Sequence, residues 1–244
     1  MKKTTLFTGL LAFGILLPAI IGSAQTVTMN FISGDGNSSG GFYVFPYYFT
    51  INSGTNTNLL MCDTFTVEIT PGESWGATIL AVANLTISDV STLEFGSEGV
   101  LTYLEACYLY QEELAAYNSN NSDPQGLYNW AVWDLFSGGT GPSTTAFGAG
   151  SSQETTIESY LSAAEAQGSS LLPSDFAGMY IVTPTNTAAA QEFFGECTIP
   201  EPGTFALVAL AVGGLALIRK RKQATISQTG KAGRLPGPPA SPTN

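Results

Sequence analysis

The central part of this chain contains no positively charged side chain. None of the eight Lys and Arg residues lies between Thr4 and Ile218, and His is absent from all 244 residues. The acidic residues are concentrated in the same segment, since 18 of the 19 Asp and Glu lie between Gln25 and Pro200. This body therefore has a formal charge of −18. Without Lys it also cannot form Lys-Asn isopeptide crosslinks.

This charge distribution excludes several classes of function. Contacts to phosphates require cationic donors, so nucleic-acid binding is excluded. The lack of His removes Ser-His-Asp and Cys-His catalysis and His-ligated zinc. Carboxylates remain as acids and bases, but the neighbours Glu112 and Glu113 would point to different faces of a helix. We therefore expect no enzymatic activity and no cofactor.

One segment shows a partial resemblance to a calcium-binding loop. Asp, Asn and Ser alternate within Ser33–Gly41, but Pro46 stands where such a loop would end in Glu. Clusters of Gly, Asn and Ser are common in turns. We therefore expect a flexible turn here and no metal site.

The chain begins with the three regions of a secretory signal. Two Lys residues precede an apolar run over Leu6–Ile21, and the small residues that follow end at Ala24. The run is shorter than the ~20 apolar residues of a membrane span. We expect residues 1–24 to be a signal peptide that signal peptidase removes between Ala24 and Gln25.

The other end of the chain combines a helix-breaking motif, an apolar segment and a basic stop. The motif Pro200, Glu201, Pro202 precedes the apolar segment 205–218, which is followed by Arg219, Lys220, Arg221 and Lys222. The basic cluster would stay in the cytoplasm and leave the acidic body outside. The 14 apolar residues cover only ~21 Å of a ~30 Å hydrocarbon core. Such a segment suits a temporary stop that a protease later removes.

This ordered combination resembles the PEP-CTERM sorting signal of Gram-negative bacteria, over residues 199–222. The resemblance implies transient anchoring in the inner membrane and recognition by an exosortase, a membrane cysteine protease. It also implies a protein of the cell surface or extracellular matrix, where the family is commonly associated with polysaccharide or biofilm. This chain differs in continuing past the basic cluster through residues 223–244, whose polar composition predicts a disordered tail.

Between the two signals, residues 25–198 have the size of one extracellular domain. Alternating and β-branched runs predict strands over 26–32, 42–51, 59–69 and 77–87. Three- and four-residue spacings predict helices over 98–117, from Asp123 to just before Gly138, and over 153–167. Strand-like patterns return at 177–183 and 191–197. The sequence predicts an α+β domain: an N-terminal antiparallel β-sheet or barrel-like sandwich, a helical middle and short C-terminal strands, followed by a single membrane segment.

A second resemblance lies within this body. The sequences Met61-Cys62-Asp63-Thr64-Phe65 and Tyr128-Asn129-Trp130-Ala131-Val132-Trp133 are similar to a recurring body of PEP-CTERM proteins and to surface thioester domains of Gram-positive bacteria. In those adhesins a Cys bonds to the side-chain amide of a Gln. Cys62 matches the Cys, whereas Asn129 occupies the Gln position with a side chain one methylene shorter. We predict that the two residues form no thioester and that Cys62 is a buried thiol or half of a disulfide.

The cysteine count leaves the disulfide pattern open. Three Cys in an exported protein allow one bridge, between any two of Cys62, Cys107 and Cys197. We expect a structural disulfide between two of them.

These observations favour a structural or adhesive role at the surface of a Gram-negative bacterium. The alternatives are a carbohydrate-binding module for extracellular polysaccharide and a thioester-type covalent adhesin. An aromatic run such as Phe42–Phe49 is more often part of a sandwich core, although alternation would turn some of its rings outward, where they would provide a sugar-stacking face. Trp130 and Trp133 lie on a predicted helix, and we expect both to belong to the core and not to a binding site.

Overall fold

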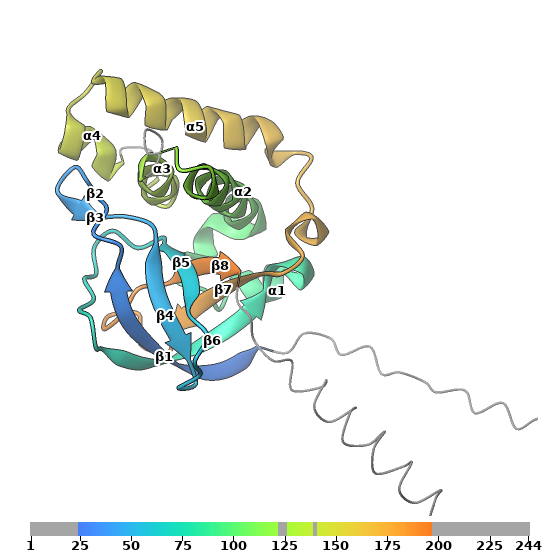
Figure 1. Cartoon of the computed structure of the whole chain (residues 1–244). Helices are drawn as coiled ribbons and strands as arrows, with labels where there is room; N and C mark the ends of the chain where they lie inside the picture. Colours follow the sequence, from blue (N-terminus) through green and yellow to red (C-terminus); the bar gives the residue numbers. More distant parts are fainter. Residues whose placement is uncertain (1–23, 122–125, 139–140, 197–244) are drawn as a thin grey trace, which may run out of the picture. The chain divides into compact units, whose positions relative to one another are not determined.

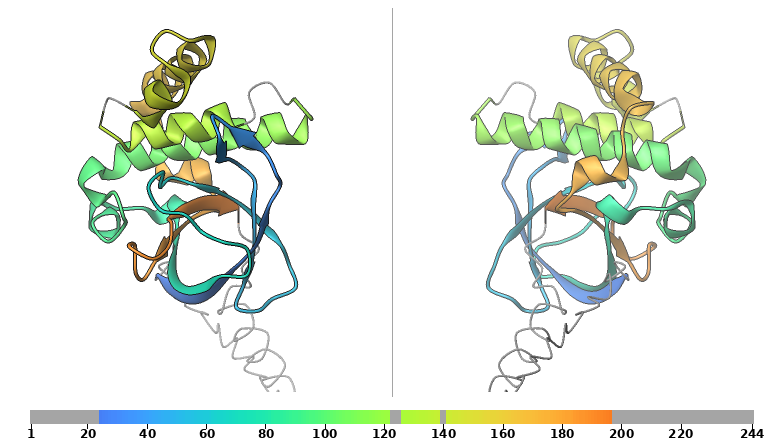
Figure 2. Two further views of the ribbon diagram at one scale, coloured as in Figure 1. Left: turned by 90° about the vertical axis from the view of Figure 1, so that its left-hand side faces the viewer. Right: turned by 90° about the vertical axis from the view of Figure 1, so that its right-hand side faces the viewer.

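The computed structural model of the chain describes residues 24–121, 126–138 and 141–196. These residues form a small β-barrel with several helices over one side (Figure 1). Two helices lie directly on the barrel and a third lies above them, as both views of Figure 2 show. The domain therefore has three layers.

The barrel is closed and entirely antiparallel, with the strand order β1-β4-β5-β8-β7-β6. Its strands are β1 (Gln25–Gly34), β4 (Tyr47–Ile51), β5 (Asn58–Cys62), β6 (Ser74–Ala81), β7 (Met179–Pro184) and β8 (Phe193–Glu196). A separate hairpin pairs β2 (Ser38–Ser39) with β3 (Phe42–Tyr43). The last strand, β8, pairs with both β5 and β7, so the two ends of the described chain complete one barrel.

Large aromatic side chains fill the barrel. Along β1, Val27, Met29 and Phe31 are buried and alternate with more exposed residues, as expected for a strand with one face inward. Rings from four strands meet inside, where the ring centroids of Phe49 and Phe193 lie 4.8 Å apart. The same cluster includes Phe31, Tyr47 and Trp75.

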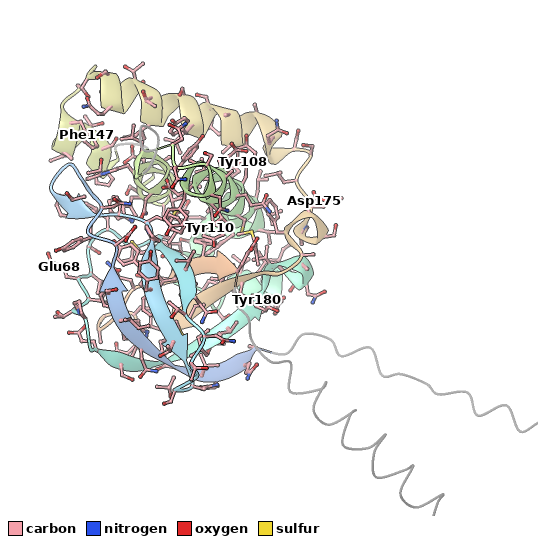
Figure 3. All side chains as sticks on the ribbon, in the orientation of Figure 1. Glu68, Tyr108, Tyr110, Phe147, Asp175 and Tyr180 are labelled. Atoms are coloured by element: carbon pink, nitrogen blue, oxygen red, sulfur yellow. The ribbon has the colours of Figure 1, made fainter. Side chains whose placement is uncertain are left out.

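The helices arise from the middle of the chain. They are α1 (Ile87–Val90), α2 (Gly99–Asn118), α3 (Leu127–Leu135), α4 (Pro142–Phe147) and α5 (Ser152–Gly168), with short 3-10 turns η1 (Val82–Asn84), η2 (Gly96–Glu98) and η3 (Pro173–Phe176). In all views α2 and α3 lie between the barrel and α5. Tyr110 of α2 lies between the helices and the barrel (Figure 3) and its hydroxyl donates to the carbonyl of Leu59, 3.3 Å away.

A second apolar core joins the helices to the barrel. Phe194 of β8 faces the helices, and its ring lies near those of Tyr103 and Phe136. Trp130 and Trp133 of α3 are 0 % and 3 % exposed, which confirms the prediction that both belong to the core.

The predicted fold class is confirmed for the described residues. The chain begins with antiparallel strands, continues with helices and returns to two short strands, and the strands close into a barrel. The helices predicted over 98–117 and 153–167 match α2 and α5 within one or two residues. The helix predicted from Asp123 begins later, at Leu127, because Gly126 precedes it in a left-handed conformation with a φ of 83°. The predicted start itself lies in residues 122–125, outside the described part.

Three predicted strands were too long. The strand over 77–87 ends at Ala81, because Thr86 caps α1 in a reciprocal pair with Asp89 and turns the chain out of the sheet. The strand over 59–69 ends at Cys62, after which the chain leaves the barrel. The run 42–51 is divided into β3 and β4 around the cis Phe45–Pro46 peptide. Helices α1 and α4 were not predicted.

Among the described residues, no helix is long and apolar enough to cross a membrane. The predicted membrane segment 205–218 lies outside them, as do residues 1–23 of the signal peptide, Cys197, the sorting signal 199–222 and the tail 223–244.

Candidate functional site

Cys62 and Asn129, the pair matched by the thioester resemblance, meet where α3 crosses the end of β5. The Asn129 side-chain amide donates to the Cys62 carbonyl over 2.8 Å, and its Oδ1 accepts from the backbone N–H of Phe45 over 3.0 Å. Asn129 is fully buried. Its amide thus bridges the last residue of β5 and the segment that precedes β4, which is a structural use of both its polar atoms.

The Cys62 thiol is enclosed beside this bridge. It is fully buried and lies 3.5 Å from the hydroxyl of Tyr47, to which the thiol donates, and that hydroxyl in turn donates to the Tyr43 carbonyl over 2.7 Å. Burial raises the pKa of the thiol to about 12, although hydrogen bonding to Tyr47 opposes the shift. A thiol with this pKa is protonated at neutral pH and is a poor nucleophile.

The two cysteines in the described residues are not bridged. Cys62 and Cys107 are both buried free thiols, so the pairing of these two residues is not observed. Burial also raises the pKa of Cys107, with the neighbouring charge of Asp63 as a second cause. Bridges to Cys197 stay predictions because that residue lies outside the described part. The absence of a Cys62–Asn129 thioester in the exported protein likewise stays a prediction.

The start of α3 is fixed by a buried carboxylate. Glu113 of α2 is fully buried and accepts from the backbone N–H of Gly126, at 3.1 and 3.3 Å from its two oxygens. The first turn of a helix has N–H groups without intrahelical partners, which attract an anion. Burial nevertheless raises the pKa of Glu113 to about 8. Glu112 lies on another face, as predicted, and only Glu113 is buried.

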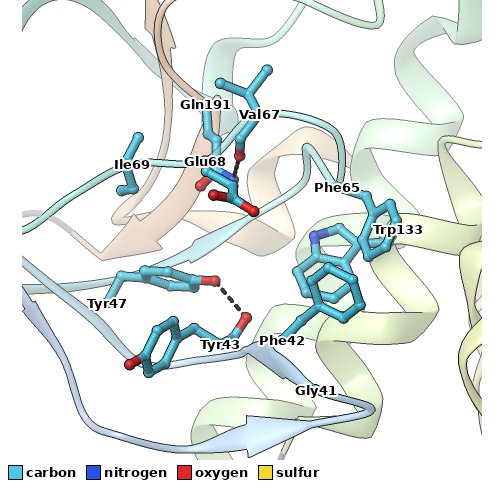
Figure 4. Close-up of a pocket in the computed structure, with 10 residues that line it drawn as sticks. All are labelled: Gly41, Phe42, Tyr43, Tyr47, Phe65, Val67, Glu68, Ile69, Trp133 and Gln191. Atoms are coloured by element: carbon cyan, nitrogen blue, oxygen red, sulfur yellow. Dashed lines mark hydrogen bonds between the residues drawn. The ribbon is translucent and has the colours of Figure 1, made fainter.

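A cavity of about 270 Å³, which we call the aromatic cavity, has five aromatic residues among the ten that line it (Figure 4). Its lining residues are Gly41, Phe42, Tyr43, Tyr47, Phe65, Val67, Glu68, Ile69, Trp133 and Gln191. They come from the β2–β3 hairpin, the start of β4, the segment after β5, helix α3 and the residues before β8. The cavity lies beside Cys62, because Tyr47 contacts the thiol and lines the cavity.

Two walls of the aromatic cavity are exposed rings. Tyr43 is 65 % exposed and Phe42 is 40 % exposed, whereas most other aromatic residues of the barrel are buried. The segment Ser33–Gly41, predicted to be a turn, leads into this hairpin and presents both rings. The aromatic run thus divides between outside and inside, with Phe45, Tyr47 and Phe49 buried.

The aromatic cavity also contains unused polar atoms. The Gln191 side-chain N–H donates to the carbonyls of Thr64, at 3.1 Å, and Val67, but its Oε1 is buried without a hydrogen-bond partner. The indole N–H of Trp133 is also buried and has no oxygen or nitrogen partner, but it lies close enough to the Cys62 thiol to lower the pKa of that group. Gln191 and Trp133 both line the aromatic cavity, so a ligand that reaches these two atoms would complete their hydrogen bonding.

Sequence reasoning did not identify Gln191 as a site residue. It reaches the cavity only because β8 pairs with β5, and 127 positions separate it from Thr64. No local motif marks it.

The described residues contain no group of three or more His, Cys, Asp or Glu side chains that could hold a metal ion. Comparison of the chain with protein-family models, with curated proteins and with solved structures finds no match.

Proposed function

We propose that this is an exported surface or extracellular-matrix protein whose folded domain adheres to polysaccharide by binding a sugar unit in the aromatic cavity. The observation that carries the proposal is the combination of exposed rings with unpartnered polar atoms in one cavity. Tyr43 and Phe42 offer ring faces, Gln191 Oε1 offers an acceptor and Trp133 Nε1 a donor. A sugar has apolar C–H faces and hydroxyl groups that both donate and accept, so it matches both features.

The export part of the proposal is supported by the sequence. The secretory signal ending at Ala24 and the PEP-CTERM-like segment 199–222 flank the domain on both sides. We propose that signal peptidase and an exosortase-like protease remove them, after a transient stay in the inner membrane. An acidic body without Lys or Arg is well suited to stay soluble outside the cell.

Binding of sugars tests the adhesive role directly. The purified protein is titrated with extracellular polysaccharide from a Gram-negative biofilm and with an array of defined oligosaccharides, while Trp fluorescence is recorded. We expect saturable binding that Tyr43→Ala weakens about tenfold, which corresponds to about 1.4 kcal/mol. The matched control is Ile87→Ala, because Ile87 is 84 % exposed and is not part of the cavity lining. The proposal fails if no glycan binds, or if both variants bind as the wild type does.

A second candidate function is covalent adhesion through a thioester, favoured by the contact between Asn129 and Cys62. The thiolate would attack the Asn129 amide carbon, release ammonia and leave an acyl thioester that external amines could capture. Against it stand the raised pKa of Cys62 and the two hydrogen bonds that already hold the Asn129 amide. A loss of one ammonia from the intact mass, regained as a methylamine adduct, would favour this candidate over saccharide binding.

A further inference from the structure

A second cavity, of about 390 Å³, shares Phe65 and Trp133 with the aromatic cavity but has a different character. Two carboxyl side chains, Asp63 and Glu94, form part of its wall. Two further rings, Phe95 and Phe136, lie against each other with centroids 4.6 Å apart. We call this site the acidic cavity.

The carboxyl groups around the acidic cavity differ in how many hydrogen-bond partners their oxygens have. Glu192, which is fully buried, accepts from the Tyr103 hydroxyl over 2.8 Å, from the Glu94 backbone N–H over 3.1 Å and from the Thr183 hydroxyl. Asp63 is 1 % exposed and accepts from Thr64 through Oδ1, but its Oδ2 has no hydrogen-bond partner. Oε2 of Glu94 is also buried and unpartnered.

Asp63 and Glu94 both line this cavity, where the Glu192 carboxyl is a close neighbour of Asp63 and the Thr64 hydroxyl is a close neighbour of Glu94. A buried, ionised carboxylate oxygen without a hydrogen-bond donor is energetically unfavourable. The protein cannot supply a cationic partner from its own body, because no Lys, Arg or His lies between Thr4 and Ile218. A ligand with a positive charge would satisfy both atoms.

We propose that the acidic cavity binds a primary alkylammonium group, held between Asp63 and Glu94 and flanked by aromatic rings. An ammonium group has three N–H donors, and the two unpartnered carboxylate oxygens are acceptors for them. The rings of Phe65, Phe95 and Trp133 suit the alkyl chain and the cation together. The group belongs either to a free diamine or to a Lys side chain of a partner, and this proposal does not depend on saccharide binding.

A divalent metal ion fits the acidic cavity less well. Calcium takes six to eight oxygen ligands, whereas only two carboxyl side chains line this cavity, beside four aromatic rings, and no group of three or more His, Cys, Asp or Glu that could hold a metal occurs among the described residues. An organic cation fits the cavity better, because the faces of the aromatic rings partly stabilise its charge.

Below about pH 7, protons occupy both carboxyl groups when the ammonium is absent. Burial and the adjacent Glu192 raise the pKa of Asp63 well above its usual range, and burial raises the pKa of Glu94 to about 7. The other titratable groups that face them are Tyr103 and Cys107, whose pKa values are also raised by burial. The cation displaces protons from the two carboxyl groups into solvent, so binding should strengthen as pH rises.

The test is calorimetric titration of the purified protein with 1,5-diaminopentane and, separately, with Nα-acetyl-lysine methylamide. Titration at pH 8 in about 0.5 M NaCl screens attraction to the acidic surface in general. We expect saturable binding, at least tenfold weaker at pH 5.5, and at least tenfold weaker at pH 8 in Asp63→Asn and in Glu94→Gln. The neutral analogue 1-pentanol should not compete. Binding of the diamine alone identifies a free amine as the ligand, and binding of the lysine derivative identifies a protein side chain.

The control variant is Glu98→Gln, which removes an exposed carboxylate outside the cavity and should leave binding unchanged. Circular dichroism verifies folding, and Glu94→Gln alone decides the matter if Asp63→Asn does not fold. Three results overturn the proposal: no amine binds, amine binding is equal in all variants, or Ca²⁺ displaces the amine and is itself lost in both cavity variants.

Discussion

Asn129 provides the sharpest test of how the helices are attached to the barrel. Its side chain satisfies two buried backbone groups at once, the Cys62 carbonyl at 2.8 Å and the Phe45 N–H at 3.0 Å. Substitution by Ala removes both partners and leaves these groups inside a fully buried region that water does not reach. We expect Asn129→Ala to be among the most destabilising single changes in the domain.

The magnitude follows from the number of groups left unsatisfied. Each buried backbone group without a partner costs about 1–3 kcal/mol, so Asn129→Ala should lower the free energy of unfolding by about 2–6 kcal/mol. Asn129→Asp keeps an acceptor for Phe45 but cannot donate to Cys62 unless it is protonated. It should therefore be less destabilised at pH 5 than at pH 8. Asn129→Gln adds a methylene at a site with no free space, which typically costs about 1–3 kcal/mol.

Urea unfolding followed by Trp fluorescence measures these differences. Asn118→Ala is the matched control, because Asn118 is exposed at the end of α2 and should change stability by less than about 0.5 kcal/mol. A loss below about 1 kcal/mol for Asn129→Ala would show that the two hydrogen bonds do not hold α3 to the barrel.

Three other predictions concern charge and covalent state. Because the pKa of Glu113 is raised to about 8, the wild type should lose about 3 kcal/mol of stability between pH 5 and pH 8 through this group. In urea unfolding, Glu113→Gln should lose less stability than the wild type between pH 5 and pH 8. An equal pH dependence in both proteins would contradict the raised pKa of Glu113. The intact mass of the exported protein should show no methylamine adduct attributable to Cys62, whereas an adduct that disappears in Cys62→Ala would establish the thioester. Mass spectrometry of surface-exposed protein should also find residues 223–244 absent, and their presence would argue against sorting by proteolytic removal.

Local sequence patterns identified much of this fold. The three- and four-residue spacing of apolar side chains placed α2 and α5, and alternation placed the inward face of β1. Helix α1 was missed although Thr86 and Asp89 stand at the spacing of a capping pair, because its four residues are too few for a periodic pattern. Helix α4 starts at Pro142 and is also too short to show one.

Local sequence patterns could not predict the two cavities. The Cys62–Asn129 contact was anticipated only through the family resemblance, and the closure of the barrel depends on pairings between distant segments. The backbone N–H of Asp63 donates a hydrogen bond to the carbonyl of Glu192 over 3.2 Å, just beyond the paired residues of β5 and β8, and this contact brings the two acidic residues together. Pairing between distant strands cannot be recognised from a few neighbouring residues, so Gln191 and Glu192 look like ordinary polar residues at the start of the strand predicted over 191–197.

The place of β8 in the barrel has a consequence for folding during secretion. This strand is the last in the described chain, yet it lies between β5 and β7 and not at a free edge. If the chain is exported as proposed, strands β5 and β7 therefore cannot be joined until residue 196 has crossed the inner membrane. The proposed sorting segment begins at Ile199, so translocation would pause almost as soon as the final strand emerges. On the proposed export route, the barrel closes next to the membrane, while the chain is still tethered, and the earlier strands must be kept from aggregating until then.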